Sequence, residues 1–207
     1  MKFRILAGVM SLGLAVTAAY AQEGNRNDIT VSAIGSFQQN TNGNGIQQSS
    51  TNSAGALFSY RYFFTNHQGL ELNYAYSRYD QQFTSLIPST TLTGTLGVPA
   101  HVNEATAAYV YRLGLGHRLS PFFSAGTGAL LFTPTNSFAF NSVNGSTFAT
   151  PDFVYSAGAD IAVSRRISLR LGYRGHVFQA PDFGIANLNT GSVTHMAEPF
   201  GGLSFHF

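Results

Sequence analysis

The chain has 207 residues, no cysteine, and a charged content of only 10%, against roughly 25% in an ordinary soluble domain. The absence of cysteine excludes disulfides, thiolate metal sites and a cysteine nucleophile. The hydrophobic content of 44% excludes the composition of a disordered chain. The formal net charge of +2 includes Lys2, which is the only lysine, and Arg4.

Residues 1–21 have the pattern of a secretory signal peptide. Lys2 and Arg4 form a positive N-terminal region, and a mostly apolar stretch follows from Ile5 to Val16. That stretch is shorter than the about 20 residues that a spanning helix needs, so we expect cleavage and a single domain over 22–207. The residues that define the predicted cleavage site are Ala19, Ala21 and Gln22.

Cleavage removes both of these basic residues from the 11, which leaves nine arginines against nine acidic residues. The remaining chain is therefore formally neutral. Its only adjacent basic pair is Arg165-Arg166, which is too little for the basic face that nucleic acids require. We expect no nucleic-acid partner.

Period-two alternation runs through the rest of the chain and predicts β-strands. In 70–77, Leu and Tyr alternate with Glu, Asn, Ala and Ser, and 167–174 alternates in the same way. The segment 120–133 leaves its phase open, because Phe122 and Phe132 favour one face and Phe123 the other. The eight predicted strands are 28–37, 53–64, 70–77, 101–113, 120–133, 152–163, 167–174 and 192–207.

Short and long connectors alternate between these segments. The short ones are 65–69, 114–119 and 164–166, and the long polar ones are 38–52, 81–100, 134–151 and 180–191. Such alternation is typical of outer-membrane barrels. We therefore predict an all-β fold, an eight-stranded antiparallel up-and-down transmembrane β-barrel with long extracellular loops and short periplasmic turns.

Alternation alone does not decide whether the apolar faces point outward to lipid or inward, as in a soluble ligand-binding barrel. A soluble barrel carries many surface lysines, and this chain has none beyond Lys2. The apolar faces end in Tyr and Phe, as interfacial aromatic girdles do. An arginine on the lipid face at the midplane costs about 2–4 kcal/mol. We therefore predict apolar faces toward lipid and a lumen filled by side chains.

Continuing each alternation places four arginines and four carboxylates in the lumen. They are Arg61, Glu71, Glu104, Arg112, Asp160, Arg170, Arg174 and Glu198. Buried charges are tolerated when paired, and this set can neutralise itself. The tight hairpin at 164–166 predicts Asp160 opposite Arg170, with Arg61 and Glu71 as diagonal neighbours. The network either fills and rigidifies the lumen, which we favour, or gates a narrow ion path.

The last ten residues, 198–207, alternate apolar residues and end on phenylalanine, and they resemble the C-terminal strand of bacterial outer-membrane proteins. The stretch 119–128, Leu-Ser-Pro-Phe-Phe-Ser-Ala-Gly-Thr-Gly, is similar to a strand of small OmpA-like barrels. Residues 22–207 thus resemble the OmpA-like and OmpX-like eight-stranded family, without a peptidoglycan-binding domain. The resemblance implies outer-membrane localisation, contact with lipid and lipopolysaccharide, and assembly by periplasmic chaperones and the barrel-assembly machinery. The assembly signal that it implies is Leu203, Phe205 and Phe207.

No catalytic, cofactor-binding or metal site is predicted. Val177 follows His176 and Met196 follows His195, whereas lipid A deacylases have a serine directly after the catalytic histidine. Nothing in the sequence brings Ser156 or Ser192 next to either histidine. The remaining histidines, which show no metal-ligand spacing and are expected to be solvated or interfacial, are His67, His101, His117 and His206.

The resulting prediction is a non-catalytic outer-membrane barrel that contributes to envelope integrity or binds an unknown extracellular ligand through its loops. The alternatives are a lipid-modifying enzyme of the lipid A deacylase type and a narrow ion pore.

Overall fold

The structure is a computed structural model that describes residues 26–86, 95–114, 118–135, 139–140 and 143–207. The predicted signal peptide and its cleavage site lie outside these residues. Within the described ranges, no helix has the length and apolar character needed to cross a membrane.

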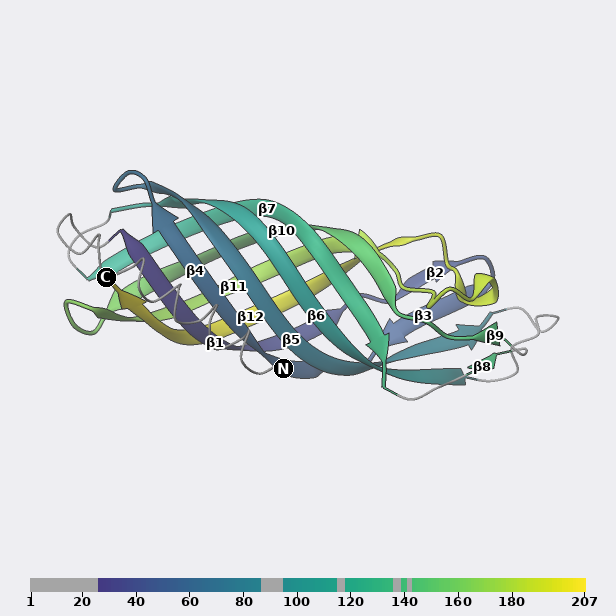
Figure 1. Ribbon diagram of the computed structural model, residues 1–207. Coiled ribbons are helices and arrows are strands. Elements are labelled where there is room, and N and C mark those ends of the chain that lie inside the picture. Colours follow the sequence, from purple (N-terminus) through teal and green to yellow (C-terminus); the bar gives the residue numbers. More distant parts are fainter. Residues whose placement is uncertain (1–25, 87–94, 115–117, 136–138, 141–142) are drawn as a thin grey trace, which may run out of the picture.

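Long, tilted strands make up the wall of a closed barrel (Figure 1). Each is antiparallel to its neighbours, and the first pairs with the last, which closes the ring. The wall strands are β1 (Asn27–Gln38), β4 (Ser53–Phe63), β5 (Gln68–Ser85), β6 (Thr95–Arg112), β7 (Leu119–Pro134), β10 (Phe148–Ala162), β11 (Ile167–Gln179) and β12 (Val193–His206). The predicted eight-stranded antiparallel barrel is confirmed.

The two ends of the barrel differ. The end at which β4 meets β5, β6 meets β7 and β10 meets β11 is called the turn end, and there the Phe207 amide donates to the Asn27 carbonyl over 2.9 Å. The opposite end is called the loop end. Its additional elements are β2 (Thr41–Gly43), β3 (Ile46–Ser50), β8 (Ala139–Phe140), β9 (Val143–Asn144) and the 3-10 helix η2 (Ala186–Leu188).

The predicted bounds of the connector 81–100 are wrong at both ends. β5 continues to Ser85, β6 begins at Thr95, and Thr84 pairs with Thr95. The outward residues of β5 here are polar and those of β6 are Thr95, Gly97 and Pro99, so the apolar alternation fades, yet inward Phe83 and Val98 are fully buried. Packing inside the barrel therefore extends this hairpin beyond the stretch that the sequence pattern marks.

Side chains divide between the two faces of the wall as predicted. Leu70 and Leu72 on β5 are each 55% exposed on the outside, whereas Glu71 between them is buried. On β7, Phe122 is buried and Phe123 is exposed, which settles the open phase of that strand. The barrel thus has an apolar exterior, and its buried charged residues lie on the inner face of the wall.

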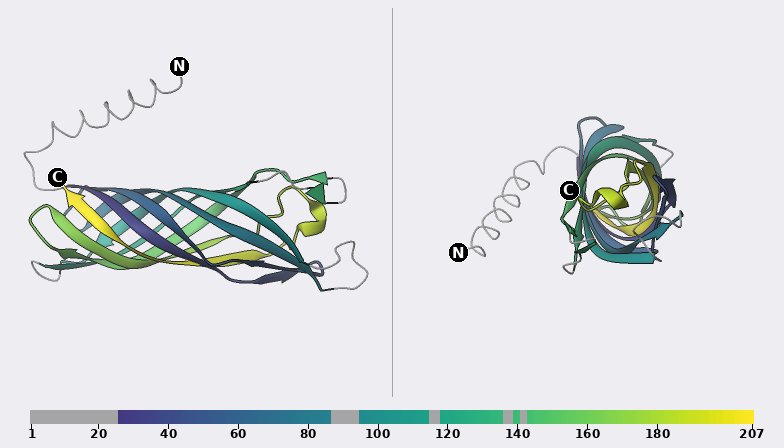
Figure 2. Two further views of the ribbon diagram at one scale, coloured as in Figure 1. Left: turned by 90° about the horizontal axis from the view of Figure 1, so that it is seen from below. Right: turned by 90° about the vertical axis from the view of Figure 1, so that its right-hand side faces the viewer.

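An apolar core closes the loop end. The connector 180–192 folds inward, and in the end-on view of Figure 2 the η2 segment lies within the outline of the barrel. Its side chains Phe183 and Leu188 are fully buried, and the Phe183 ring meets the Phe83 ring edge-on at 6.3 Å. We call this connector the loop-end plug. The buried residues of the core are Ile46, Tyr79, Phe83, Val98, Ala100, Val102, Leu130, Phe132, Phe178, Phe183, Ile185, Leu188 and Met196.

Candidate functional site

Two groups of charges occupy the lumen, and the first lies toward the turn end. Arg61 on β4 lies directly opposite Glu71 on β5, not diagonally as expected, and the two are ion-paired. Asp160 lies opposite Arg170, as the hairpin geometry predicts, and accepts two hydrogen bonds of 2.5 and 3.0 Å from it. Such bidentate pairing suits the planar guanidinium. The Phe122 ring lies 3.9 Å from the Arg61 guanidinium carbon. The turn-end cluster consists of Asp28, Arg61, Glu71, Asp160 and Arg170.

Asp28 extends this cluster to the rim of the barrel. Its Oδ2 lies 3.4 Å from Arg170, and its Oδ1 lies 2.6 Å from His206 Nδ1. When Nδ1 donates to Asp28, His206 Nε2 accepts from the Ser168 hydroxyl, 2.7 Å away. His206 is expected from the sequence to be solvated or interfacial; its side chain lies at the barrel rim and is only 13% exposed. A pocket of about 290 Å³ opens beside Ser168 and His206, and Arg112 lies in its wall.

The second group, called the central cluster, lies between the turn-end cluster and the plug. Arg174 on β11 is ion-paired with Glu104 on β6 and lies 3.3 Å from Glu198 on β12. His176, two residues after Arg174, donates from Nδ1 to Asp152 over 2.7 Å. The central cluster consists of Glu104, Asp152, Arg174, His176 and Glu198.

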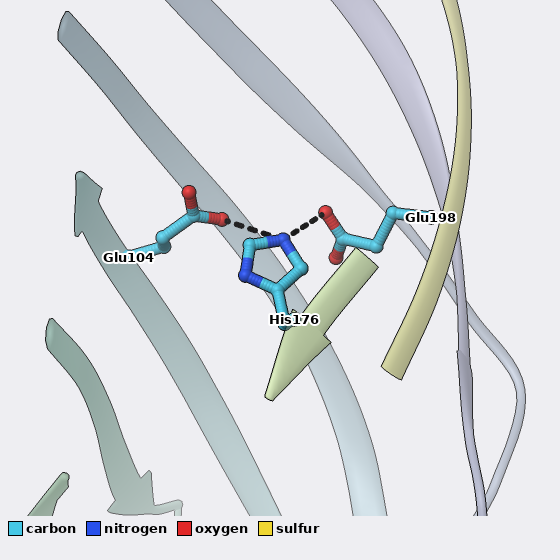
Figure 3. Close-up of side chains that lie close together, drawn as sticks. All are labelled: Glu104, His176 and Glu198. Atoms are coloured by element: carbon cyan, nitrogen blue, oxygen red, sulfur yellow. Dashed lines mark ion pairs between the residues drawn. The ribbon is translucent and has the colours of Figure 1, made fainter. Parts of the chain in front are cut away.

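His176 points across the lumen between two carboxylates (Figure 3). Its Nε2 lies 3.3 Å from Glu198 Oε2 and 3.7 Å from Glu104 Oε2. The imidazole is completely buried, and its Nε2 makes no hydrogen bond. The arrangement joins three strands across the barrel in one layer.

The expected balance of four arginines and four carboxylates in the lumen is wrong. Seven of the eight predicted residues are buried in the lumen, whereas Arg112 is only half-buried at the turn end, with its guanidinium 4.0 Å from the Phe63 ring. Among the described residues, three arginines and six carboxylates are buried. The six carboxylates are Asp28, Glu71, Glu104, Asp152, Asp160 and Glu198.

Sequence reasoning missed Asp28, Asp152, His176 and His206 as members of these clusters. A usable signal was present, because Asp28 and Asp152 share the alternation of inward residues on their own strands. Both open a predicted strand, where alternation has no preceding residue to support it. The same signal was present for the histidines, because His176 continues the inward phase of Arg174 on β11 and His206 continues that of Glu198 on β12.

Neither histidine considered for catalysis has a serine partner among the described residues. His176 bonds to Asp152, and His195 Nε2 lies 2.9 Å from the Tyr155 hydroxyl on the outside of the wall. Ser156 is instead bonded to a second serine, and Ser192 to backbone carbonyls. The arrangement expected of a lipid A deacylase is therefore not formed at these positions.

The residues of the implied assembly signal lie at the turn end of β12. Leu203 and Phe205 are exposed on the outside of the wall, and the Phe205 ring stacks on the ring of the terminal Phe207 at 6.0 Å. They form an apolar edge next to the seam between β12 and β1.

Solved structures of small outer-membrane barrels are similar to this chain. OprG from Pseudomonas aeruginosa is 13% identical with a TM-score of 0.62, and the match covers 89% of this chain and 97% of OprG. Ail from Yersinia pestis, solved with the heparin analogue sucrose octasulfate, is 17% identical with a TM-score of 0.54, covering 90% and 100%. Neisserial surface protein A is 13% identical with a TM-score of 0.56, again covering 90% and 100%. At these identities the likeness shows the fold.

No curated protein sequence matches the chain. The profile of the outer membrane protein beta-barrel domain, in contrast, matches residues 5–195. That match covers nearly the whole chain and agrees with the closed barrel, its apolar exterior and its polar lumen. The chain therefore belongs to the outer membrane protein beta-barrel family and resides in the outer membrane.

Proposed function

We propose that this protein is a non-catalytic barrel, closed along its length, that contributes to envelope integrity and presents its loop end to an extracellular ligand. The observation that carries the proposal is the loop-end plug. Phe183, Ile185 and Leu188 turn inward and are buried against the wall. An eight-stranded lumen is only wide enough to be filled by side chains, and this one is filled by apolar groups at one end and by paired charges below.

A closed barrel leaves the loop end as its main functional surface. Polar loops on a rigid scaffold commonly carry binding, and here the wall itself extends outward through the β5–β6 hairpin and the β2–β3 hairpin that pairs with it. The Ail structure, which holds a heparin analogue, supports ligand binding by a barrel of this shape. For this chain, the extended hairpins form the proposed binding surface.

Two measurements test the proposal together. In planar lipid bilayers, the purified barrel is expected to give no discrete channel events. In a strain that lacks the gene, uptake of a hydrophobic dye is expected to rise and to return to normal when the wild-type chain is supplied. Channel events would contradict the closed barrel, and unchanged dye uptake would contradict a role in envelope integrity.

Biogenesis is proposed to depend on the exposed edge formed by Leu203, Phe205 and Phe207, as a signal for periplasmic chaperones and the barrel-assembly machinery. Phe207→Ala is expected to lower the amount of folded barrel in the outer membrane several-fold. Leu131→Ala, which removes another exposed apolar side chain from the wall, is the matched control. Equal membrane levels of the two variants would contradict this role.

The turn end favours a second candidate function, hydrolysis of a small acyl ester. Ser168, His206 and Asp28 have the connectivity of nucleophile, base and orienting acid, and the Ser168–His206 pair borders a pocket. A fluorophosphonate probe would then label Ser168 covalently, and Ser168→Ala would abolish labelling. Ser204→Ala, which removes a buried hydroxyl bonded to Thr30 at the same end, should leave labelling intact. No labelling of the folded wild type would eliminate this candidate.

A further inference from the structure

Three buried side chains of the central cluster each turn one ligand atom toward a common point (Figure 3). Glu104 comes from β6, His176 from β11 and Glu198 from β12, and their ligand atoms lie within 4.8 Å of one another. Because each strand supplies one residue, the sequence shows no spacing of the metal-ligand type. The barrel topology alone brings the three together.

The two carboxylates are held by their other contacts. Glu104 Oε1 accepts from Arg174 and from the Thr106 hydroxyl, the latter over 3.0 Å. Glu198 Oε1 accepts from the Ser36 hydroxyl over 2.7 Å. These contacts orient each carboxylate so that its Oε2 faces the imidazole.

The imidazole is oriented by Asp152. The contact with Asp152 holds a proton on His176 Nδ1, so in the neutral imidazole, the form that binds a metal, the free lone pair is on Nε2. That Nε2 is buried and has no hydrogen-bond partner. A carboxylate on the far nitrogen of a metal-ligating histidine is the usual outer partner in metal sites.

The spacing of the three atoms suits a small ion. Bonds of 2.0–2.1 Å to a tetrahedral centre place neighbouring ligand atoms about 3.4 Å apart. The observed separations from His176 Nε2 are 3.3 Å to Glu198 and 3.7 Å to Glu104. Both separations are close to that value, and the two carboxylate ligand atoms lie within 4.8 Å of each other, so the three atoms can form one face of a coordination shell after the carboxylates move closer together.

The net charge of the central cluster also favours a bound cation. The cluster holds three carboxylates and one arginine: Arg174 contacts Glu104 and Glu198, and Asp152 contacts His176. With a neutral imidazole, the cluster has two more negative than positive charges. A buried excess of this size is costly, and one divalent cation offsets it completely.

We propose that Glu104, His176 and Glu198 bind a divalent transition-metal ion in the lumen, with Zn²⁺ as the ion that their nitrogen and oxygen ligands fit. Ca²⁺ and Mg²⁺ prefer oxygen ligands alone, so the imidazole selects against them. Arg174 keeps its contact with Glu104 Oε1, and its 3.3 Å contact with Glu198 Oε2 is the one that the ion replaces. The bound ion ties β6, β11 and β12 together beneath the plug.

The test loads the metal during folding, because all three ligands are buried. The full chain is refolded in detergent with ZnCl₂, with CaCl₂ or with neither, then desalted, and the retained metal is measured by mass spectrometry. One Zn²⁺ for each folded chain, with no retained Ca²⁺, is the expected result. Folded wild-type chain that retains neither ion would overturn the proposal.

Variants locate the ion. His176→Asn and Glu104→Gln should each abolish Zn²⁺ retention, and Asp152→Asn should lower the affinity about 10- to 100-fold by releasing the imidazole. His206→Asn is the matched control, because His206 is also paired with a carboxylate through Nδ1 but lies in the other cluster. Equal Zn²⁺ retention in His176→Asn and His206→Asn would refute the assigned site.

Electron paramagnetic resonance of the wild-type chain tests His176 as a ligand without a substitution at that position. Wild-type chain refolded with Cu²⁺ should show coupling of the copper to one nitrogen in its electron paramagnetic resonance spectrum. His206→Asn should preserve that coupling. A copper spectrum without nitrogen coupling would rule out His176 as a ligand.

Discussion

The two ends of this lumen are filled by side chains of opposite chemistry. At the turn end, Arg61 and Arg170 are paired with carboxylates on neighbouring strands. At the loop end, the plug residues Phe183 and Leu188 pack against apolar side chains of the wall. Paired charges and apolar side chains fill the same narrow barrel, so the width of the barrel does not determine which kind of side chain fills it.

The difference lies in how each closure depends on single residues. A paired charge depends on its partner, because removal of one leaves the other buried and uncompensated. The resulting loss in the free energy of unfolding is about 3–5 kcal/mol. An apolar plug depends on volume, and the cost of a deletion varies with how far the surroundings relax. The turn end should therefore be the more sensitive of the two to single substitutions.

The largest effect is expected from Arg170→Met. Arg170 is buried and contacts both Asp160 and Asp28, so its loss removes a cationic partner from two buried carboxylates at once. We expect a loss of about 3–5 kcal/mol in the free energy of unfolding. Because the chain has no tryptophan, urea unfolding in lipid vesicles is followed by circular dichroism.

Arg78→Met is the control for this prediction, because Arg78 is exposed. It should change the free energy of unfolding by no more than about 0.5 kcal/mol. Similar losses in both variants would mean that the effect comes from the substitution itself and not from the buried pairs.

A smaller effect is expected from Leu188→Ala in the plug. Leu188 is fully buried but lies on a connector and not on a wall strand, so we expect its surroundings to relax and the loss to lie near the low end for such sites, about 2–3 kcal/mol. Leu86→Ala, at a side chain that is 54% exposed near the same end, should be close to neutral. A loss greater than that of Arg170→Met would reverse the proposed ranking of the two ends.

A double substitution separates pairing from simple filling. Arg61→Met with Glu71→Met replaces both members of a directly opposed pair, and buried pairs replaced in this way are often neutral in stability. Each single variant should therefore lose more than the double variant, which should stay within about 1 kcal/mol of wild type. Losses that simply add would show that Arg61 and Glu71 do not stabilise each other.

The sequence was sufficient for the wall but not for the layers inside it. Alternation identifies inward residues because successive side chains on a strand point to opposite faces. Together with the tight turn at 164–166, it predicted that Asp160 lies opposite Arg170. It could not reveal that His176, Glu104 and Glu198 converge, since Glu104 lies across the lumen. The plug was also beyond prediction, because 180–192 has no period and its burial depends on contacts with distant strands.

The smallest effect is expected at Gly97, where the outward extension of β6 begins. A Cβ at Gly97 would meet no atom within 4 Å, so Gly97→Ala should stabilise the barrel by about 0.4–1 kcal/mol by restricting the unfolded chain. Gly128→Ala is the matched control in the wall, where the added carbon would crowd Ala105 and Thr106 and should destabilise. If Gly97→Ala also destabilises, the β5–β6 extension is not held in this register, and the rigid loop-end surface would lose its basis. If only Gly128→Ala destabilises the barrel, the wall continues as a rigid sheet past the apolar band to the surface where binding is proposed.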